Sequence, residues 1–286
     1  MSGLRAKTIG SSFLYRLLVG YRRDACWKSA RKAVISRLIC ALSLLIAVPA
    51  PGGPAEPQPD AAVFPHPEKL GYRIEWRLIV AGNATVQLTR PLPQRWQIDL
   101  HLESAGLVSR LYRVLDTYKV VTNEAFCGMS SAFEAQEGKR RFSTAAEFDN
   151  ARHKLSYNEK DLVKNTAVQH EIDIAPCTYE ILGALNALRE MRITPGKAVT
   201  LPMTNGKKMV NAKVEAQAKE NISIDGKSYS TVRYEAFVFN NVIYRRKGRL
   251  FIWMTDDAER LPVQIRIQTG FPIGSITLEL ERDEKL

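Results

Sequence analysis

Apolar and polar residues alternate along most of the chain after residue 70. Tyr72, Ile74 and Trp76 occupy every second position, with Arg73 and Glu75 between them. A period of two is typical of a β-strand with one buried face. The pattern continues to residue 80 and recurs in the segments 86–88, 96–102, 168–174, 210–214, 263–267 and 276–280.

Turn dipeptides separate these segments. Asn205-Gly206 and Asp225-Gly226 favour tight β-hairpins, and Glu137-Gly138 is a weaker signal of the same kind. Gly82-Asn83 is expected to turn the first strand towards residues 86–88. Ten or more strands with short turns and one apolar face predict a mainly β fold, either a curved antiparallel sheet or a partly open barrel.

Residues 178–192 follow a helical period instead. The apolar positions of this segment are Ile181, Ala184, Leu185, Leu188 and Met191. Thr178 is expected to cap the helix, and Pro195-Gly196 to end it. We expect the sheet to wrap around this one amphipathic helix, since an apolar stripe usually faces a core. A helix that binds a partner is the alternative.

Positive charge is concentrated at the start of the chain. The net charge is +11, but residues 1–50 hold nine basic residues and one acid, which leaves 32 basic and 29 acidic residues in 51–286. This near balance gives no electrostatic reason to expect a nucleic-acid partner.

The basic residues up to Arg37 lead into a mostly apolar stretch, residues 38–48, and then into small residues. This order is typical of a secretory signal peptide, and the stretch is shorter than the roughly 20 residues of a transmembrane helix. Residues 1–50 are therefore expected to be a signal peptide, or an N-terminal extension retained as an anchor, and the protein to be exported to the periplasm or cell envelope. Prolines make 51–70 a linker, so that 71–286 is one β-rich domain.

Export decides how the cysteines are interpreted. Cys127 and Cys177 remain after the signal segment, and two cysteines in an oxidising compartment most simply form a disulfide. A metal site and a reactive thiol are the alternatives.

Catalytic and cofactor motifs are missing from the sequence. It contains no phosphate-binding glycine loop, H-E-x-x-H or G-x-S-x-G. Asp256-Asp257 is the best acidic pair, and its place between an apolar strand and Pro262 favours a turn over a calcium site. We therefore expect a protein that is not an enzyme, with no cofactor and no metal.

Two basic clusters are the candidate binding residues. One cluster is Lys139, Arg140 and Arg141; the other is Arg245, Arg246, Lys247 and Arg249. Charged hairpin ends discourage aggregation and are common. The alternative is a patch for anionic ligands such as lipid head groups or envelope polysaccharide.

Several motifs are spread over residues 71–280. The most specific are Trp253-Met254-Thr255-Asp256-Asp257 with Pro262-Val263, and Ile273-Gly274-Ser275-Ile276; the others are Tyr72–Trp76, Gly82, Leu111–Val114 with Asp116, Glu137–Arg140, Phe148-Asp149, Cys177, Ile181–Leu185 with Arg189, Gly196, and Arg260-Leu261. Together they resemble the bacterial family called domain of unknown function 3108. The resemblance implies exported proteins with a wrapped β-sheet and no established activity. A sheet around a helix is also similar in outline to periplasmic lipoprotein carriers, although fold alone does not define function.

These observations predict a non-enzymatic periplasmic or envelope-associated domain that binds a lipophilic or amphiphilic ligand. Trp76, Trp96, Phe237 and Trp253 are the candidate residues near its cavity. The alternative is a structural or assembly protein of the envelope that holds no ligand, and a hydrolase with an unfamiliar site is the third. An apolar cavity of about 300 Å³ or more would favour a carrier, and a filled core a structural protein.

Overall fold

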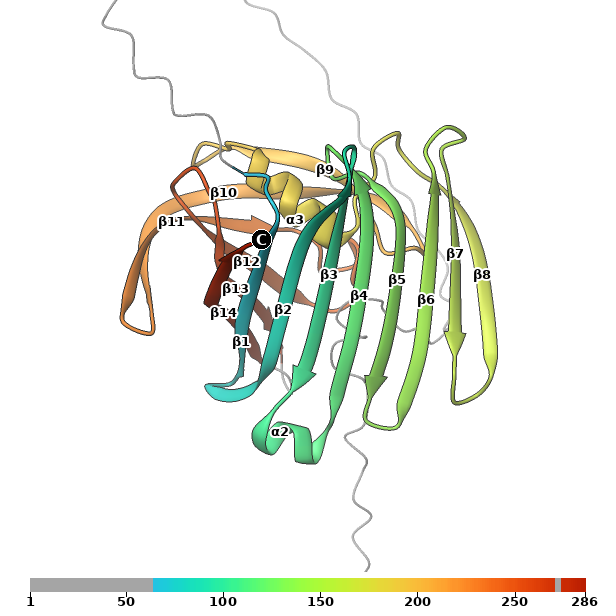
Figure 1. The fold of residues 1–286 in the computed structure, drawn as a ribbon, viewed down its shortest axis with the longest axis horizontal. Helices are drawn as coiled ribbons and strands as arrows, with labels where there is room; N and C mark the ends of the chain where they lie inside the picture. Colours follow the sequence, from blue (N-terminus) through green and yellow to red (C-terminus); the bar gives the residue numbers. More distant parts are fainter. Residues whose placement is uncertain (1–63, 271–273) are drawn as a thin grey trace, which may run out of the picture. The chain divides into compact units, whose positions relative to one another are not determined.

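The computed structural model describes residues 64–270 and 274–286. The expected signal segment 1–50 lies outside these residues, as does most of the expected linker. Fourteen strands and two short helices form the described chain (Figure 1). Neither helix is long and apolar enough to cross a membrane.

The first half of the chain is an eight-stranded meander. Its strands are β1 (Glu68–Trp76), β2 (Ile79–Leu92), β3 (Arg95–Ser104), β4 (Val114–Asn123), β5 (Gly128–Glu137), β6 (Arg140–Asp149), β7 (Lys154–Asp161) and β8 (Thr166–Asp173). A short helix, α2 (Gly106–Leu111), joins β3 to β4. The strand β1 begins three residues before the expected domain boundary at residue 71.

The second half adds six strands to the same sheet. They are β9 (Ala198–Thr204), β10 (Met209–Ile224), β11 (Lys227–Ala236), β12 (Gly248–Thr255), β13 (Pro262–Thr269) and β14 (Ser275–Lys285). Because β14 pairs with β1, all fourteen strands form one antiparallel sheet, with β8 and β9 at its edges. The predicted mainly β fold, a curved and open antiparallel sheet, is confirmed.

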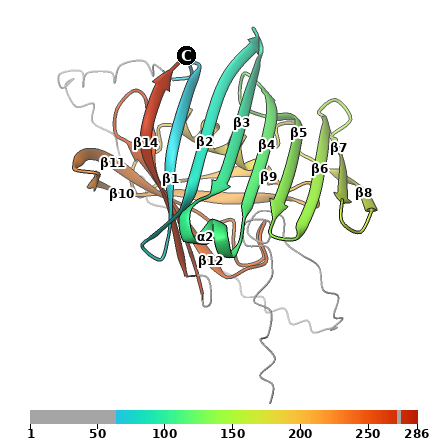
Figure 2. The ribbon, with the colours of Figure 1, turned by 60° about the horizontal axis from the view of Figure 1, so that its bottom comes forward.

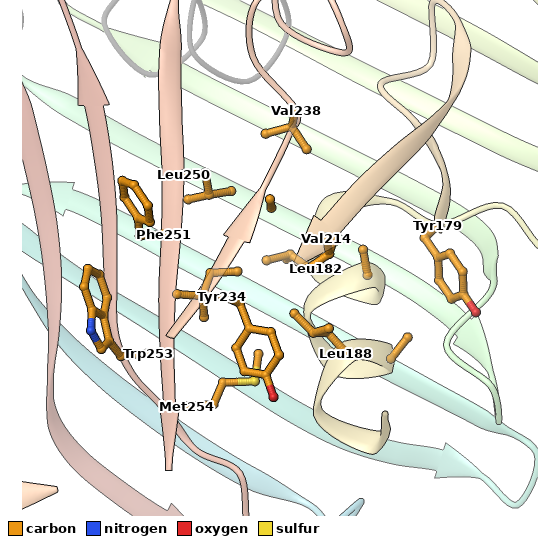
Figure 3. Packing of buried hydrophobic residues seen from close by; sticks show 14 of the residues in the cluster. Tyr179, Leu182, Leu188, Val214, Tyr234, Val238, Leu250, Phe251, Trp253 and Met254 are labelled. Atoms are coloured by element: carbon orange, nitrogen blue, oxygen red, sulfur yellow. The ribbon is translucent and has the colours of Figure 1, made fainter. Parts of the chain in front are cut away.

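The helix α3 (Ile181–Glu190) lies inside the curve of the sheet, between the first meander and the strands β9 and β10 (Figures 1 and 2). It contacts β4 on one side and β9 on the other. Leu182 and Leu188 point into a core that also contains Val214, Tyr234 and Met254 (Figure 3). The sheet therefore closes over the helix by curling back on itself.

The expected helix cap is wrong. The residue before the helix is Glu180, and its side chain makes no capping hydrogen bond. The hydroxyl of Thr178 donates to the carbonyl of Ala175 at 3.1 Å instead. The helix starts three residues after Thr178 because a bridge between Tyr179 and Met203 keeps the preceding backbone extended.

The expected turn at Gly82-Asn83 is also wrong. The chain turns at Arg77 and Leu78, whose φ angles of 52° and 68° are left-handed. Gly82 lies inside β2, where a Cβ atom would be 2.2 Å from the carbonyl oxygen of Glu103. A glycine at this position therefore allows the backbones of β2 and β3 to lie close together. The other hairpin predictions are confirmed: Gly206, Gly226 and Gly138 all lie in turns with positive φ.

Candidate functional site

A small cavity lies where α3 begins, and a carboxyl group is part of its wall. The carboxylate of Glu180 accepts hydrogen bonds from the Tyr118 hydroxyl at 2.6 Å and the Ser131 hydroxyl at 3.2 Å. These two partners come from the neighbouring strands β4 and β5. The remaining walls are formed by Phe133, Thr144, Tyr157, Ile181, Thr204, Asn205 and Tyr244.

Burial changes the protonation of this cavity. It raises the pKa of Glu180 to about 7, although the hydrogen bonds from Tyr118 and Ser131 oppose the shift. Burial also raises the pKa of the Tyr118 and Tyr244 hydroxyls above their usual range. At neutral pH the phenols are therefore hydrogen-bond donors, and the carboxyl group is about half protonated.

The size of the cavity limits what it can do. Its volume is about 40 Å³, which is room for about three water molecules. Ser131 places a hydroxyl beside a carboxyl group of raised pKa, a pair of the kind that can supply a nucleophile and a base, but the volume is far below the roughly 300 Å³ of an ordinary small-molecule site. Through its hydrogen bonds with Tyr118 and Ser131, Glu180 connects the start of α3 to the strands β4 and β5.

Two further acidic residues are buried, one in β4 and one in β5. Asp116 is 3% exposed and Glu137 is 0% exposed. Burial, together with the charge of Glu137, raises the pKa of Asp116 to about 8, and the backbone amide of Gln136 opposes the shift only in part. Neither carboxyl oxygen of Asp116 has a hydrogen bond of ordinary geometry within the described chain. Asp116 is therefore mostly neutral at pH 7.

A buried ion pair fixes the end of α3. The guanidinium group of Arg189, 1% exposed, donates to both carboxylate oxygens of Glu68, which is 2% exposed. It also donates to the carbonyls of Arg260 and Glu259, each at 3.1 Å, and lies 3.7 Å from the centre of the Phe64 ring. This arrangement joins α3 to β1 and to the segment before β13.

Glu68, Asp116 and Glu137 were not among the predicted site residues. Each occupies an apolar position of its strand's alternation, as Asp116 does between Val114 and Tyr118. An acid in the buried phase of a strand is the signal that could have identified them.

The predicted cysteine pair is joined in the structure. Cys127 and Cys177 form a disulfide, with their Cα atoms 5.0 Å apart. The bridge connects the β4–β5 turn to the segment that leads into α3. Among the residues that the structure describes, no group of three or more His, Cys, Asp or Glu side chains could hold a metal ion.

The predicted acidic turn is confirmed. Asp257 accepts hydrogen bonds from the backbone amides of Glu259 and Arg260, at 3.1 and 3.0 Å, and from the hydroxyl of Thr255 at 2.7 Å. Asp256 pairs with Lys219 at 2.6 Å. These contacts make the pair a structural turn.

The two basic clusters have different surroundings. Lys139 lies in the turn between β5 and β6, and Arg140 and Arg141 are the first two residues of β6. Arg245, Arg246 and Lys247 lie in the connection between β11 and β12. The ammonium group of Lys208 donates hydrogen bonds to the Asn241 and Val242 carbonyls of this connection. Arg249, by contrast, makes a two-pronged ion pair with Glu235, with both contacts at 2.8 Å.

The four predicted cavity aromatics do not line the cavity beside Glu180. Trp96 is buried against Phe126, with ring centres 5.9 Å apart. Trp253 points away from α3 (Figure 3) and is covered by Arg266, 5.3 Å above its ring. Phe237 is 37% exposed, and Trp76 is partly buried. The prediction was wrong because strand alternation does not show which face is inside.

Comparison with known proteins gives a family and a fold. Residues 71–281 match the family described as protein of unknown function (DUF3108), which agrees with the resemblance seen over residues 71–280. No curated protein matches. A solved β-barrel-like protein of domain of unknown function DUF1849 from Brucella abortus is similar in fold, with a TM-score of 0.51 and 9% identity over 77% of this chain and 98% of that chain. A DUF1089 family protein from Pseudomonas aeruginosa, also 9% identical, covers 70% of this chain and 90% of its own, with a TM-score of 0.28.

Proposed function

This chain belongs to the DUF3108 family, and we propose that it is a non-enzymatic, exported domain of the cell envelope that acts through its outer surface. In this proposal it is a structural or assembly protein, and it carries no lipid in the curve of its sheet. Any amphiphilic ligand then binds to the outer surface and not inside the sheet.

The filled interior is the observation that supports this proposal. The inner face, where an acyl chain would lie in a carrier, is occupied by α3 and by core side chains such as Leu188, Tyr234 and Met254 (Figure 3). The cavity beside Glu180, at about 40 Å³, is far below the roughly 300 Å³ of a small-molecule site.

The Arg189–Glu68 ion pair supports the same conclusion. A carrier has to move its helix or open its sheet to admit a lipid. Here the helix end is held by a pair of charges that are 1% and 2% exposed, and separating a buried pair costs several kcal/mol. The helix is therefore built as a fixed part of the core.

Titration with a fluorescent fatty-acid probe tests the proposal. The wild-type protein is expected to give no saturable one-to-one binding. A variant that hollows the interior, Leu188→Ala with Met254→Ala, is the matched control, because it creates apolar space that a probe can enter. Saturable binding by the wild type that phospholipid displaces would overturn the proposal.

The envelope location has a separate test. Residues 1–60 fused to a reporter that is active only outside the cytoplasm are expected to give signal, since the basic and apolar order of 1–50 is that of a signal peptide. Retention of the reporter in the cytoplasm would contradict the proposed location.

A further inference from the structure

Four connections lie at one end of the first meander. In an antiparallel meander every second turn falls at the same end, and the connections after β1, β3, β5 and β7 do so here (Figure 1). We call their residues the tip face: 77–80, 105–113, 138–141 and 161–165.

Backbone hydrogen bonds join these connections into one continuous row. The amide of Ala105 donates to the carbonyl of Ala81 at 2.8 Å, that of Gly138 to Arg113 at 2.7 Å, and that of Leu162 to Arg141 at 2.9 Å. The Tyr112 ring also covers the Gly138 turn, since a Cβ atom there would be 2.8 Å from the ring. The tip face is therefore a single surface of fixed shape.

Exposed aliphatic side chains gather on the tip face. Seven of the eleven large apolar residues that the described chain exposes belong to it: Leu78, Ile79, Val80, Leu107, Leu111, Leu162 and Val163. Leu78 is 94% exposed and Leu111 76% exposed. The helix α2 buries none of its residues, although a surface helix ordinarily buries its apolar stripe.

Stability does not explain these residues. Leu78 has a φ of 68° in a tight turn, a conformation in which asparagine or glycine costs less than a bulky side chain. An almost fully exposed leucine there gains no burial to offset that cost. An apolar patch on a soluble domain marks a surface that meets a partner or a membrane.

Charge identifies the partner. The tip face contains seven basic residues and one acid, Asp161, which leaves 25 basic and 28 acidic residues in the rest of 51–286. Asp161 is paired with Lys164 at 3.5 Å. Aliphatic side chains ringed by Lys and Arg are the combination that binds the interface of an anionic bilayer, apolar groups entering below the head groups and cations remaining among them.

We propose that the tip face docks on an anionic lipid bilayer, so that the strands of the first meander stand on the membrane. This inference rests on the proposed function, because it specifies the surface through which an envelope domain with a filled interior would act. Lys139, Arg140 and Arg141 contribute to this surface, whereas Arg245, Lys247 and Arg249 belong to the β11–β12 region and do not.

Vesicle flotation of the full-length protein tests the proposal. The vesicles contain phosphatidylcholine alone or with phosphatidylglycerol. A charge variant, Arg110→Gln with Arg113→Gln and Lys139→Gln, is expected to bind the anionic vesicles about a hundredfold more weakly at low salt, since each charge contributes about fivefold. The difference is expected to shrink as salt is raised.

An apolar variant tests the aliphatic side chains. Leu78→Asn with Leu111→Ser is expected to weaken binding by about tenfold or more. Both substitutions are at exposed positions, and asparagine suits the left-handed turn, so the thermal melting of this variant is expected to match or exceed that of the wild type. Matched controls are Leu92→Ser, at the opposite end of the meander, and Arg245→Gln with Lys247→Gln.

Hydrogen exchange separates docking by the tip face from binding by residues 1–50. Anionic vesicles are expected to protect the amides of residues 105–113 and 138–141, and to leave the opposite turn at 150–153 unchanged. Unprotected tip amides, or equal losses of binding in the tip variants and the controls, would overturn the proposal. Protection that appears without vesicles as protein concentration rises would assign the surface to a second copy of the chain instead. These outcomes concern only the tip face. The filled interior is tested separately, by the titration with the fatty-acid probe.

Discussion

Removing the carboxylate of Glu68 is expected to leave the buried guanidinium of Arg189 without its counter-ion. The two side chains are 2% and 1% exposed, so water cannot replace the lost partner. Breaking a buried pair from one side costs about 3–5 kcal/mol. We therefore expect Glu68→Leu to lower the free energy of unfolding by about that amount, and Arg189→Met to have a similar effect.

The double variant is expected to lose less than the two single variants together. Removing both charges avoids the uncompensated ion, although the carbonyls of Arg260 and Glu259 still lose their donor. These two lost hydrogen bonds correspond to about 2–3 kcal/mol, so the coupling between Glu68 and Arg189 is expected to exceed about 2 kcal/mol.

Urea denaturation at pH 7, followed by tryptophan fluorescence and with the disulfide intact, measures these values. Glu215→Gln is the matched control, because the partly exposed pair of Lys213 and Glu215, 2.6 Å apart, should contribute less than about 1 kcal/mol. Single-variant losses below about 1 kcal/mol, or losses that simply add, would show that the pair does not fix α3 in the core.

Three further predictions concern stability. The pKa of Glu180 is about 7 in the folded protein and 4.5 in its ordinary state, so the folded form binds more protons between these values, and the contribution of Glu180 to the free energy of unfolding should fall by about 3 kcal/mol as pH rises from 4.5 to 7. Asp116, whose raised pKa is about 8, adds a fall of its own over the same range. Glu180→Gln should therefore make the denaturation–pH profile shallower by the Glu180 contribution, and an unchanged profile would contradict the assignment. Replacing Cys127 and Cys177 by serine should lower the free energy of unfolding by about 4 kcal/mol, since the bridge closes a loop with a sequence separation of 50. Intact-mass analysis of the wild type should show both cysteines blocked to alkylation until they are reduced. Free alkylation without reductant would count against the bridge. Leu78→Gly should raise stability by up to about 1 kcal/mol by relieving its left-handed φ, and a lower melting temperature would show that the leucine packs.

The sequence pattern was sufficient for the fold class and most of the turns. Alternation of apolar and polar residues depends on local geometry, and the glycines of the β-hairpins have φ values that other residues disfavour. For the same reason the turn at Arg77 and Leu78 could not be predicted: neither residue type favours the conformation that it adopts. Its position is fixed instead by the pairing of β1 with both β2 and β14.

The candidate site was harder to predict, because alternation divides a strand into two faces without showing which is inside. Trp253 was expected near a cavity, but it points away from α3 (Figure 3) and is covered by Arg266. Asp116 and Glu137 lie on the inner side, although acids are rarely buried. The strands β9 and β10 lie behind the first meander and help α3 to fill the curve of the sheet (Figures 1 and 2), a long-range arrangement that no local pattern encodes.

Native mass spectrometry can show whether the curve of the sheet is filled by the protein itself or by a bound lipid. The protein would be purified from cells without detergent or delipidation and measured intact. A filled interior predicts the mass of the exported chain with one disulfide and nothing bound. A population that carries one lipid-sized molecule per chain, and keeps it through purification, would contradict it.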